Sequence, residues 1–355
     1  MFTIRPTSIS RSHPMPKKAD IRIPTIEEIQ ATRSLLAPHL PMTPLAYAPY
    51  LSEQLGRRVW FKLETQQPTH SFKVRPAFAN LLTHKTKAQQ HGVITSSSGN
   101  FAQAVAYASQ QLDIDAQIVM MSITAPVKIE RTKQRGARVV ICGPTYEDRW
   151  NTTYRLQEET GRLLVHPYDS IETISGSGVI ALELLEQLER PFSVLIPTSG
   201  GGMLSGVART LKALRPACHI CGIQPKANGA MKRSLDAGER INVGTFHTIA
   251  DALTASYPGE RTFEIAKQYV DQMQVVEENA IAEAVRTLYH QHKLVVETGG
   301  SVGVAALQSS PGLLKDLPHQ DIVCVLSGGN IAHSQLQSIL SETNEQQSEE
   351  TPRSE

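Results

Sequence analysis

The chain has 355 residues, enough for a large buried core and for about two domains of ordinary size. Its 35 lysines and arginines against 34 aspartates and glutamates give a net charge of +1, which excludes bulk electrostatic attraction to nucleic acid or to an acidic membrane. Hydrophobic residues make up 40% of the chain, and no apolar run approaches the roughly 18 to 20 residues that a membrane helix needs. We therefore expect a soluble protein with neither nucleic-acid nor membrane partners.

The two ends of the chain differ in composition from its body. Residues 1–20 contain four lysines and arginines and no acid before Asp20, whereas residues 341–355 are polar, acidic and without aromatic side chains. Such segments cannot bury enough apolar surface to fold alone, so we predict a disordered tail at each end. The ordered body would then span about residues 21–340.

Between the tails, short apolar runs alternate with helical patterns. The runs predict strands near residues 92–95, 117–120, 138–142, 193–197, 219–223 and 321–326, with helices such as 102–108 and 128–134 between them. Near-continuous apolar strands separated by helices are typical of parallel sheets covered on both faces. The predicted fold class is α/β.

Three loops at the ends of predicted strands are rich in glycine, serine or asparagine, and such sheets bind ligands at the carboxyl ends of their strands. The loops read Ser96-Ser97-Ser98-Gly99-Asn100-Phe101, Thr198-Ser199-Gly200-Gly201-Gly202-Met203, and Ser327-Gly328-Gly329-Asn330. The three consecutive glycines let backbone N–H groups surround a phosphate, although a tight strand-to-helix turn is the ordinary explanation. The first loop can cap a helix, hold a substrate carboxylate or do both, and Ser327 is either a turn residue or a hydroxyl for a ring nitrogen.

Lys73 lies in Ser71-Phe72-Lys73-Val74-Arg75, between a turn-forming segment and an alanine-rich helical stretch. On its own it reads as a solvated lysine at a helix start. An amine that forms a Schiff base needs a lowered pKa, and Arg75 could supply the neighbouring positive charge. A reactive lysine, a phosphate loop, a carboxylate site and a hydroxyl for a ring nitrogen together describe a pyridoxal phosphate site.

With these motifs in order, the chain resembles the threonine dehydratase and serine racemase branch of the fold type II pyridoxal phosphate enzymes, from about residue 24 to residue 330. The resemblance implies a small domain of residues 89–168 inserted in a large one of residues 21–88 and 169–340, and a homodimer. It implies that Lys73 is the Schiff-base lysine and that Ser98 lies on the opposite face of the cofactor ring. Further implied contacts are substrate binding by Ser97, Ser98, Gly99 and Asn100, cofactor binding by Asn100, Gly200, Gly201, Gly202, Met203 and Ser327, and an acidic position at Glu297.

Several positions depart from the family pattern around the implied pocket. His70 stands where a glycine is usual, Pro76 and Ser199 also replace glycines, and Phe101 replaces a histidine. We therefore take His70, Phe101 and Glu297 as candidate specificity residues. Gln224 and Ala230 occupy the places where many relatives have acidic metal ligands, and a neutral amide with a methyl group supplies too little charge for a hard cation. We expect no metal at that place.

The inferred activity is a pyridoxal phosphate-dependent ammonia-lyase that eliminates the β-hydroxyl of threonine, serine or a related amino acid. Lys73 would remove the α-proton, and the neutral Ser327 hydroxyl favours loss of a β-substituent over transamination. An amino-acid racemase that uses Ser98 as proton donor is one alternative, and a non-catalytic cofactor-binding regulator is another. A dehydrogenase is disfavoured, since no Gly-x-Gly-x-x-Gly follows a strand.

The four cysteines include Cys218-His219-Ile220-Cys221, which has metal or redox spacing. A zinc site would need a second ligand pair, and Cys142 and Cys324 are isolated in apolar runs. Positions three apart on a strand also face opposite sides. We therefore expect reduced structural cysteines and a cytoplasmic location.

Overall fold

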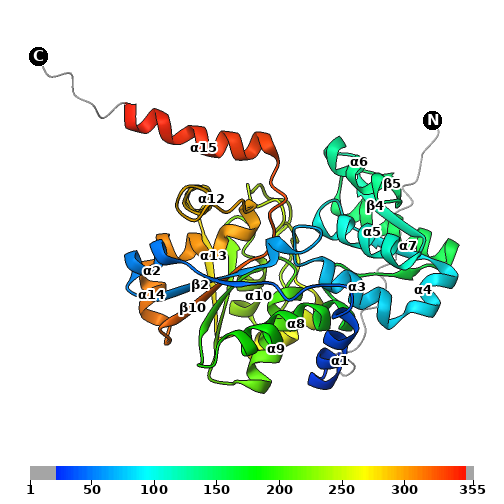
Figure 1. Ribbon diagram of the computed structural model, residues 1–355. Coiled ribbons are helices and arrows are strands. Elements are labelled where there is room, and N and C mark those ends of the chain that lie inside the picture. The colour runs from blue at the N-terminus through cyan, green and yellow to red at the C-terminus, as the bar shows by residue number, and fades with distance from the viewer. Residues whose placement is uncertain (1–20, 349–355) are drawn as a thin grey trace, which may run out of the picture.

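The computed structural model describes residues 21–348, and the protein contains two β-sheets with helices packed against them (Figure 1). The predicted N-terminal tail, residues 1–20, and residues 349–355 lie outside the described part. The strands are β1 Leu45–Tyr47, β2 Arg58–Leu63, β3 Val93–Ser96, β4 Ala116–Met121, β5 Arg138–Cys142, β6 Leu163–Leu164, β7 Ser193–Pro197, β8 His219–Pro225, β9 Gln272–Val276 and β10 Asp321–Leu326.

The six-stranded sheet has the order β1-β2-β10-β7-β8-β9, and the four-stranded sheet has the order β5-β4-β3-β6. All paired strands run parallel except the edge strand β1, which is antiparallel to β2. Every strand of the four-stranded sheet comes from the interval between β2 and β7. This interval contains the range predicted for the inserted small domain.

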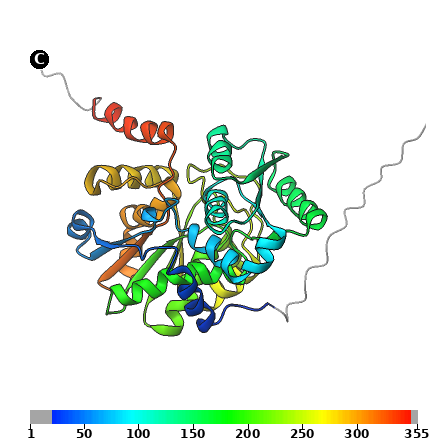
Figure 2. The same cartoon turned by 45° about the vertical axis from the view of Figure 1, so that its right-hand side comes forward.

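The helices fill the connections between strands. They are α1 Ile26–Leu36, α2 Pro49–Leu55, the 3-10 turn η2 Glu64–Gln66, α3 Val74–Thr83, α4 Lys85–His91, α5 Asn100–Leu112, α6 Pro126–Gln134, α7 Tyr146–Thr160, α8 Ile171–Gln187, α9 Gly202–Leu214, α10 Ala230–Ala237, α11 Glu260–Tyr269, α12 Glu278–His292, α13 Thr298–Ser309, α14 Pro311–Asp316 and α15 His333–Ser348. In Figure 2 the helices α3 to α7, in cyan and green, surround the four-stranded sheet.

Both faces of the six-stranded sheet are buried, as its apolar strands require. On β10, Ile322, Cys324 and Leu326 join a core with α12 and α13, whereas Val323 and Val325 point into the core beneath α8 and α9. A third core lies between α3, α5 and the four-stranded sheet. Alternate residues of one strand thus serve opposite layers, which confirms the prediction of an α/β fold with parallel sheets covered by helices.

Helix α15 continues to Ser348 and therefore extends into residues 341–348, which we predicted to be part of a C-terminal tail. The run contains no proline or glycine and is rich in good helix formers such as glutamine, leucine and glutamate. Its apolar residues Leu336 and Ile339 are three apart, and both pack against α12. Figure 1 shows α15 lying along α12 at the edge of the molecule. The polar composition was therefore compatible with a one-sided surface helix.

None of the helices that the structure describes is both long enough and apolar enough to cross a membrane.

Candidate active site

The amine of Lys73 lies at the start of α3, where this residue is the N-cap. Its Nζ donates a hydrogen bond of 2.8 Å to the backbone carbonyl of Pro167. The rings of Phe72 and Phe101 lie near the same atom, with centroids at 5.0 Å and 5.4 Å. Burial lowers the pKa of Lys73 to about 8, although the charge of Glu297 opposes the shift. A neutral amine is therefore accessible near physiological pH.

Arg75 does not supply the charge that lowers the pKa of Lys73. Its guanidinium is buried and points instead into a cluster with Glu64 and Glu183, at 2.7–2.9 Å. Lys62 completes this cluster through a 2.6 Å ion pair with Glu183. Lys73 and Arg75 are two positions apart at a helix start, where such residues face different directions, so their charged groups point apart. The cluster ties the first turn of α3 to β2 and α8, and sequence reasoning did not detect it.

The loop after β3 leads directly into α5, as predicted. The Ser97 hydroxyl accepts hydrogen bonds of 3.3 Å from the backbone N–H groups of Gly99 and Ala102, so its capping interpretation is correct. The Ser98 hydroxyl instead accepts a bond of 2.9 Å from Thr124. Phe101 is buried, in the first turn of α5. The hydroxyl of Ser98 is thus not committed to capping α5.

Asn100 connects this loop to the end of β10 and to the start of α13. Its Nδ2 donates to Glu297 Oε1 at 2.7 Å, and its Oδ1 accepts from Asn330 Nδ2 at 2.9 Å. Burial raises the pKa of Glu297 to about 7. Three side chains from distant parts of the sequence therefore form one hydrogen-bonded line next to Lys73.

The glycine loop after β7 forms the start of α9. Gly201 has a φ of +98°, which favours glycine, and α9 begins at Gly202 without a side-chain cap. A Cβ on Gly200 would lie 2.6 Å from the ring of Tyr168. The side chain of Met203 packs in the core, so this residue can offer only its backbone N–H to a ligand at the start of α9. Buried first-turn N–H groups without a cap provide donors suited to a phosphate.

Ser327 and Ser71 bring further hydroxyls to the same region. Ser327 is 5% exposed, and its carbonyl accepts from the N–H of Phe72, next to Lys73. The buried hydroxyl of Ser71 has no hydrogen-bond partner within residues 21–348. Unsatisfied buried hydroxyls are costly unless a bound group completes them.

Sequence reasoning missed the segment after β6, which contributes Pro167 to the lysine site. His166 accepts hydrogen bonds from the N–H groups of Tyr168 and Asp169, and its ring stacks on Trp150 at 4.8 Å. Burial lowers the pKa of His166 to about 4, so the imidazole is neutral at pH 7. Because β6 has only two residues, the sequence analysis did not predict a strand there or the loop that follows it.

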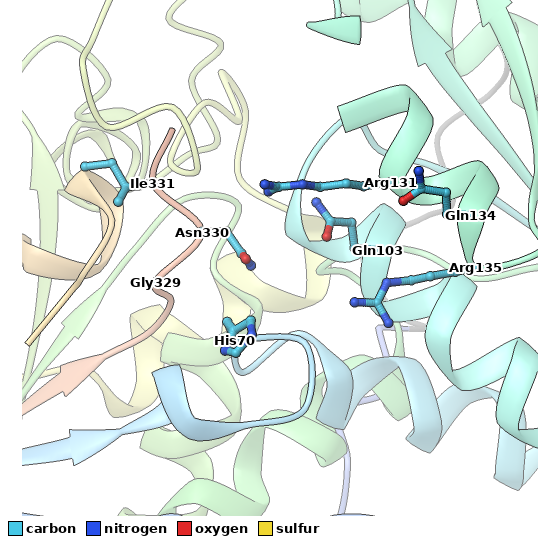
Figure 3. Close-up of a pocket in the computed structure, with 8 residues that line it drawn as sticks. All are labelled: His70, Gln103, Arg131, Gln134, Arg135, Gly329, Asn330 and Ile331. Carbon is cyan, nitrogen blue, oxygen red and sulfur yellow. The ribbon is translucent and has the colours of Figure 1, made fainter. Parts of the chain in front are cut away.

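His70, a predicted specificity residue, lines a cavity of about 440 Å³ together with Asn330 (Figure 3). Its φ of 54° places it in the left-handed region, which explains why glycine is the easier choice there. From α5 and α6, across the cavity, come Gln103, Arg131, Gln134 and Arg135.

The place predicted to lack a metal is occupied by protein contacts. Gln224 is fully buried, and its Oε1 accepts from the N–H of Lys232 at 3.0 Å. Residues 21–348 contain no group of three or more metal-ligating acidic, histidine or cysteine side chains. Cys218 and Cys221 are unpaired and lie in different cores, as expected for opposite faces of a strand.

The residues present fit pyridoxal phosphate. They provide a lysine of lowered pKa, a glycine-rich helix start without a cap, and the buried hydroxyl of Ser71, which has no partner within residues 21–348. A family model described as "Pyridoxal-phosphate dependent enzyme" matches residues 36–328. The chain belongs to this family. Its cofactor is pyridoxal phosphate, and its branch of the fold type II enzymes is that of the threonine and serine dehydratases.

Relatives within this pyridoxal phosphate family match most of the chain. The L-threonine ammonia-lyase of Thermotoga maritima is 36% identical over 316 residues, covering 89% of this chain and 78% of that protein. The structure of maize serine racemase has a TM-score of 0.85 at 33% identity, covering 92% of this chain and 100% of that one. The crystal structure of a threonine deaminase from T.th. has a TM-score of 0.82 at 38% identity, covering 87% and 99%. The fold is therefore shared over most of the chain.

Proposed function

We propose that the protein is an ammonia-lyase that converts threonine, serine or a related β-substituted amino acid into a 2-oxo acid and ammonium. The observation that carries the proposal is Lys73, whose amine has a pKa of about 8 and which belongs to the same segment as Ser71, whose buried hydroxyl has no partner within residues 21–348. Relatives named as L-threonine ammonia-lyase and threonine deaminase, at 36% and 38% identity, support it.

Lys73 would hold the cofactor and then move the substrate's α-proton on its Nζ. When bound, the cofactor supplies an electron sink for the bond that breaks at Cα. The carbonyl of Pro167 would orient the free amine, and the Phe72 and Phe101 rings lie beside it. The lowered pKa of Lys73 supports its assignment as the general base.

The loops after β7 and β10 would supply the other predicted contacts to the cofactor. First-turn N–H groups at Gly202 and Met203, with Gly200 and Gly201 free of side chains, would bind the phosphate. Ser327 would present a neutral hydroxyl to the ring nitrogen. Since a hydroxyl stabilises a protonated ring less than a carboxylate does, loss of a β-substituent is favoured over transamination.

The loop Ser97-Ser98-Gly99-Asn100 would bind the substrate carboxylate at the start of α5. Phe101 follows this loop and contributes an apolar ring, where the family pattern has a histidine that can hydrogen-bond. We propose that Phe101 limits polar substituents at Cβ, and that His70 acts more remotely, from the cavity that it lines with Asn330.

Racemisation is the second candidate, and Ser98 is the observation that favours it. Its hydroxyl is held by Thr124 rather than by the α5 backbone, so it can carry a proton to the substrate. The structural similarity to maize serine racemase supports this alternative. A cofactor-binding regulator without catalysis would keep the cofactor but release neither product.

We further propose a cytoplasmic homodimer in which residues 89–168 form a small domain that closes over the site. Four unpaired cysteines support a reducing compartment. Light scattering on the purified protein tests the dimer directly.

The test of function is an assay of the purified holoenzyme with L-serine, L-threonine and a series of β-substituted amino acids. The readouts are 2-oxo acid, ammonium and the D-isomer, with Lys73→Ala as the inactive control. Predominant 2-oxo acid supports the lyase, and predominant D-isomer supports the racemase. Cofactor binding with neither product from any substrate contradicts both. Activity lost with chelator and restored by magnesium would contradict the expected absence of metal.

A further inference from the structure

Glu297 and Asn100 belong to a continuous line of hydrogen bonds that ends at a backbone carbonyl. Glu297 Oε1 accepts from Asn100 Nδ2 at 2.7 Å, Asn100 Oδ1 accepts from Asn330 Nδ2 at 2.9 Å, and Asn330 Nδ2 also donates to the carbonyl of Thr69 at 2.9 Å. Glu297 is thus connected to the loop that precedes Lys73.

The carbonyl of Thr69 fixes the orientation of both asparagines. A carbonyl oxygen can only accept, so the Asn330 group that faces it must be the NH₂. The same NH₂ donates to Asn100, and therefore the Asn100 group on that side must be the oxygen. The NH₂ of Asn100 then faces Glu297, which must accept. A carboxylate is the strongest acceptor available for this position.

Glu297 has no solvent to stabilise its charge and no cation in direct contact within residues 21–348. It is 4% exposed, and a Cβ on Gly328 would lie 2.4 Å from its Oε1, so the carboxyl is closely enclosed. Three charged groups act on it from a distance. Lys73 lies across the site, Asp251 raises the pKa of Glu297, and Lys128 lowers it.

We propose that Glu297 is a pH-dependent positioning residue, whose carboxylate fixes the amide of Asn100 and, whenever the amine of Lys73 is free of the cofactor, favours its ammonium form. Protonation of Glu297 weakens its hydrogen bond with Asn100 and removes its charge effect on Lys73. Neither effect requires Glu297 to touch the substrate. The proposal rests on the proposed function, since Asn100 and Lys73 are the residues expected to contact and hold the cofactor.

Two physical reasons support the switch. A hydrogen bond to a charged acceptor is roughly twice as strong as one to a neutral acceptor, so protonation loosens Asn100. The pKa of Glu297, raised to about 7 by burial, places the change within the working range of pH. Above that pH Asn100 is held firmly, and below it Lys73 loses a proton more readily.

The experiment is a pH titration, from pH 5 to 9, of the absorbance band of the bound cofactor in the holoprotein and in Glu297→Gln. The glutamine keeps an oxygen that accepts from Asn100 but cannot ionise. The wild type is expected to show a transition near pH 7 that Glu297→Gln lacks. An unchanged transition in Glu297→Gln, or none in the wild type, overturns the proposal.

Asp251 and Lys128 provide matched controls with opposite signs. They form an ion pair of 2.8 Å outside the lysine site. Asp251→Asn removes a charge that raises the pKa of Glu297, so the transition moves to lower pH. Lys128→Met removes a charge that lowers it, so the transition moves to higher pH. Shifts of the same sign in both variants would contradict the assignment to Glu297.

The apoprotein separates this proposal from the proposed function. With a raised pKa, the folded state keeps a proton that the unfolded chain has lost between pH 4.5 and 7, so Glu297 makes stability fall as pH rises through that window. The urea midpoint of Glu297→Gln should lack this contribution, and equal pH dependence in both proteins would refute the titration of Glu297. Absence of any cofactor band in the wild type would refute the proposed function and, with it, the role at Asn100.

Discussion

Replacing Arg75 with methionine should be the most damaging single change away from the reacting atoms. The guanidinium makes four bonds of 2.7–2.9 Å to Glu64 and Glu183, and all three side chains are at most 5% exposed. With Lys62 the cluster holds two positive and two negative charges. Without Arg75, two buried carboxylates face one ammonium.

An uncompensated buried charge costs about 3–5 kcal/mol, against a total stability of about 5–15 kcal/mol for a typical domain. We therefore expect Arg75→Met to lower the urea midpoint of the apoprotein by about a third or more. The loss should be smaller at pH 5 than at pH 8, because one carboxyl can then take up a proton. Adding Glu183→Gln should recover part of it by restoring neutrality.

Arg155→Met is the matched control, since Arg155 pairs with Glu159 at 2.9 Å on the surface of α7 with both side chains more than half exposed. Such a pair contributes about 0.3–0.5 kcal/mol. Equal urea midpoints for Arg75→Met and Arg155→Met would refute the reasoning that the buried cluster anchors the helix carrying Lys73.

Three further outcomes follow from the site. Gly201→Ala should weaken pyridoxal phosphate binding at least about tenfold in a cofactor titration, because its Cβ would lie 2.6 Å from the Met231 side chain. Gly238 also has a positive φ, but a Cβ there would meet open space, so Gly238→Ala should bind the cofactor normally. Ser98→Ala should reduce any D-isomer formation more than 2-oxo acid formation, and equal losses would contradict its role as proton donor. His166 has a pKa of about 4 in the folded protein and 6.5 in the unfolded chain, so the unfolded chain binds more protons between these two pH values. The free energy of unfolding should therefore fall as the pH drops from 6.5 to 4. The fall should be smaller in His166→Asn.

The strand ends were predictable because parallel buried strands have a strong local signature. The runs at β7 and β10 are apolar along most of their length and fully buried, and each predicted range coincides with the strand; the range predicted for the partly exposed β5 also coincides. Topology then brings the loops that follow β7 and β10 to one edge of the six-stranded sheet. Local sequence was therefore sufficient to find the glycine loop and the loop of Ser327, whereas Lys73 was singled out only in combination with these loops.

Long-range partners were not predictable, because no local pattern records them. Glu183 lies in the middle of α8 and reads as an ordinary helical residue, yet it contacts Arg75 108 positions away. Pro167 follows a two-residue strand and acts through its backbone carbonyl, which any residue possesses. The assignment of a lowered lysine pKa was right in direction, but its cause is burial and not Arg75.

The central claim is that Lys73 is the residue that holds pyridoxal phosphate. Borohydride reduction of the holoprotein, followed by proteolysis and mass spectrometry, tests it most directly. The account predicts a single phosphopyridoxyl group on Lys73, with loss of the absorbance band, and no label in Lys73→Ala. A label on another lysine in the wild type, or a reducible band that survives in Lys73→Ala, would contradict it.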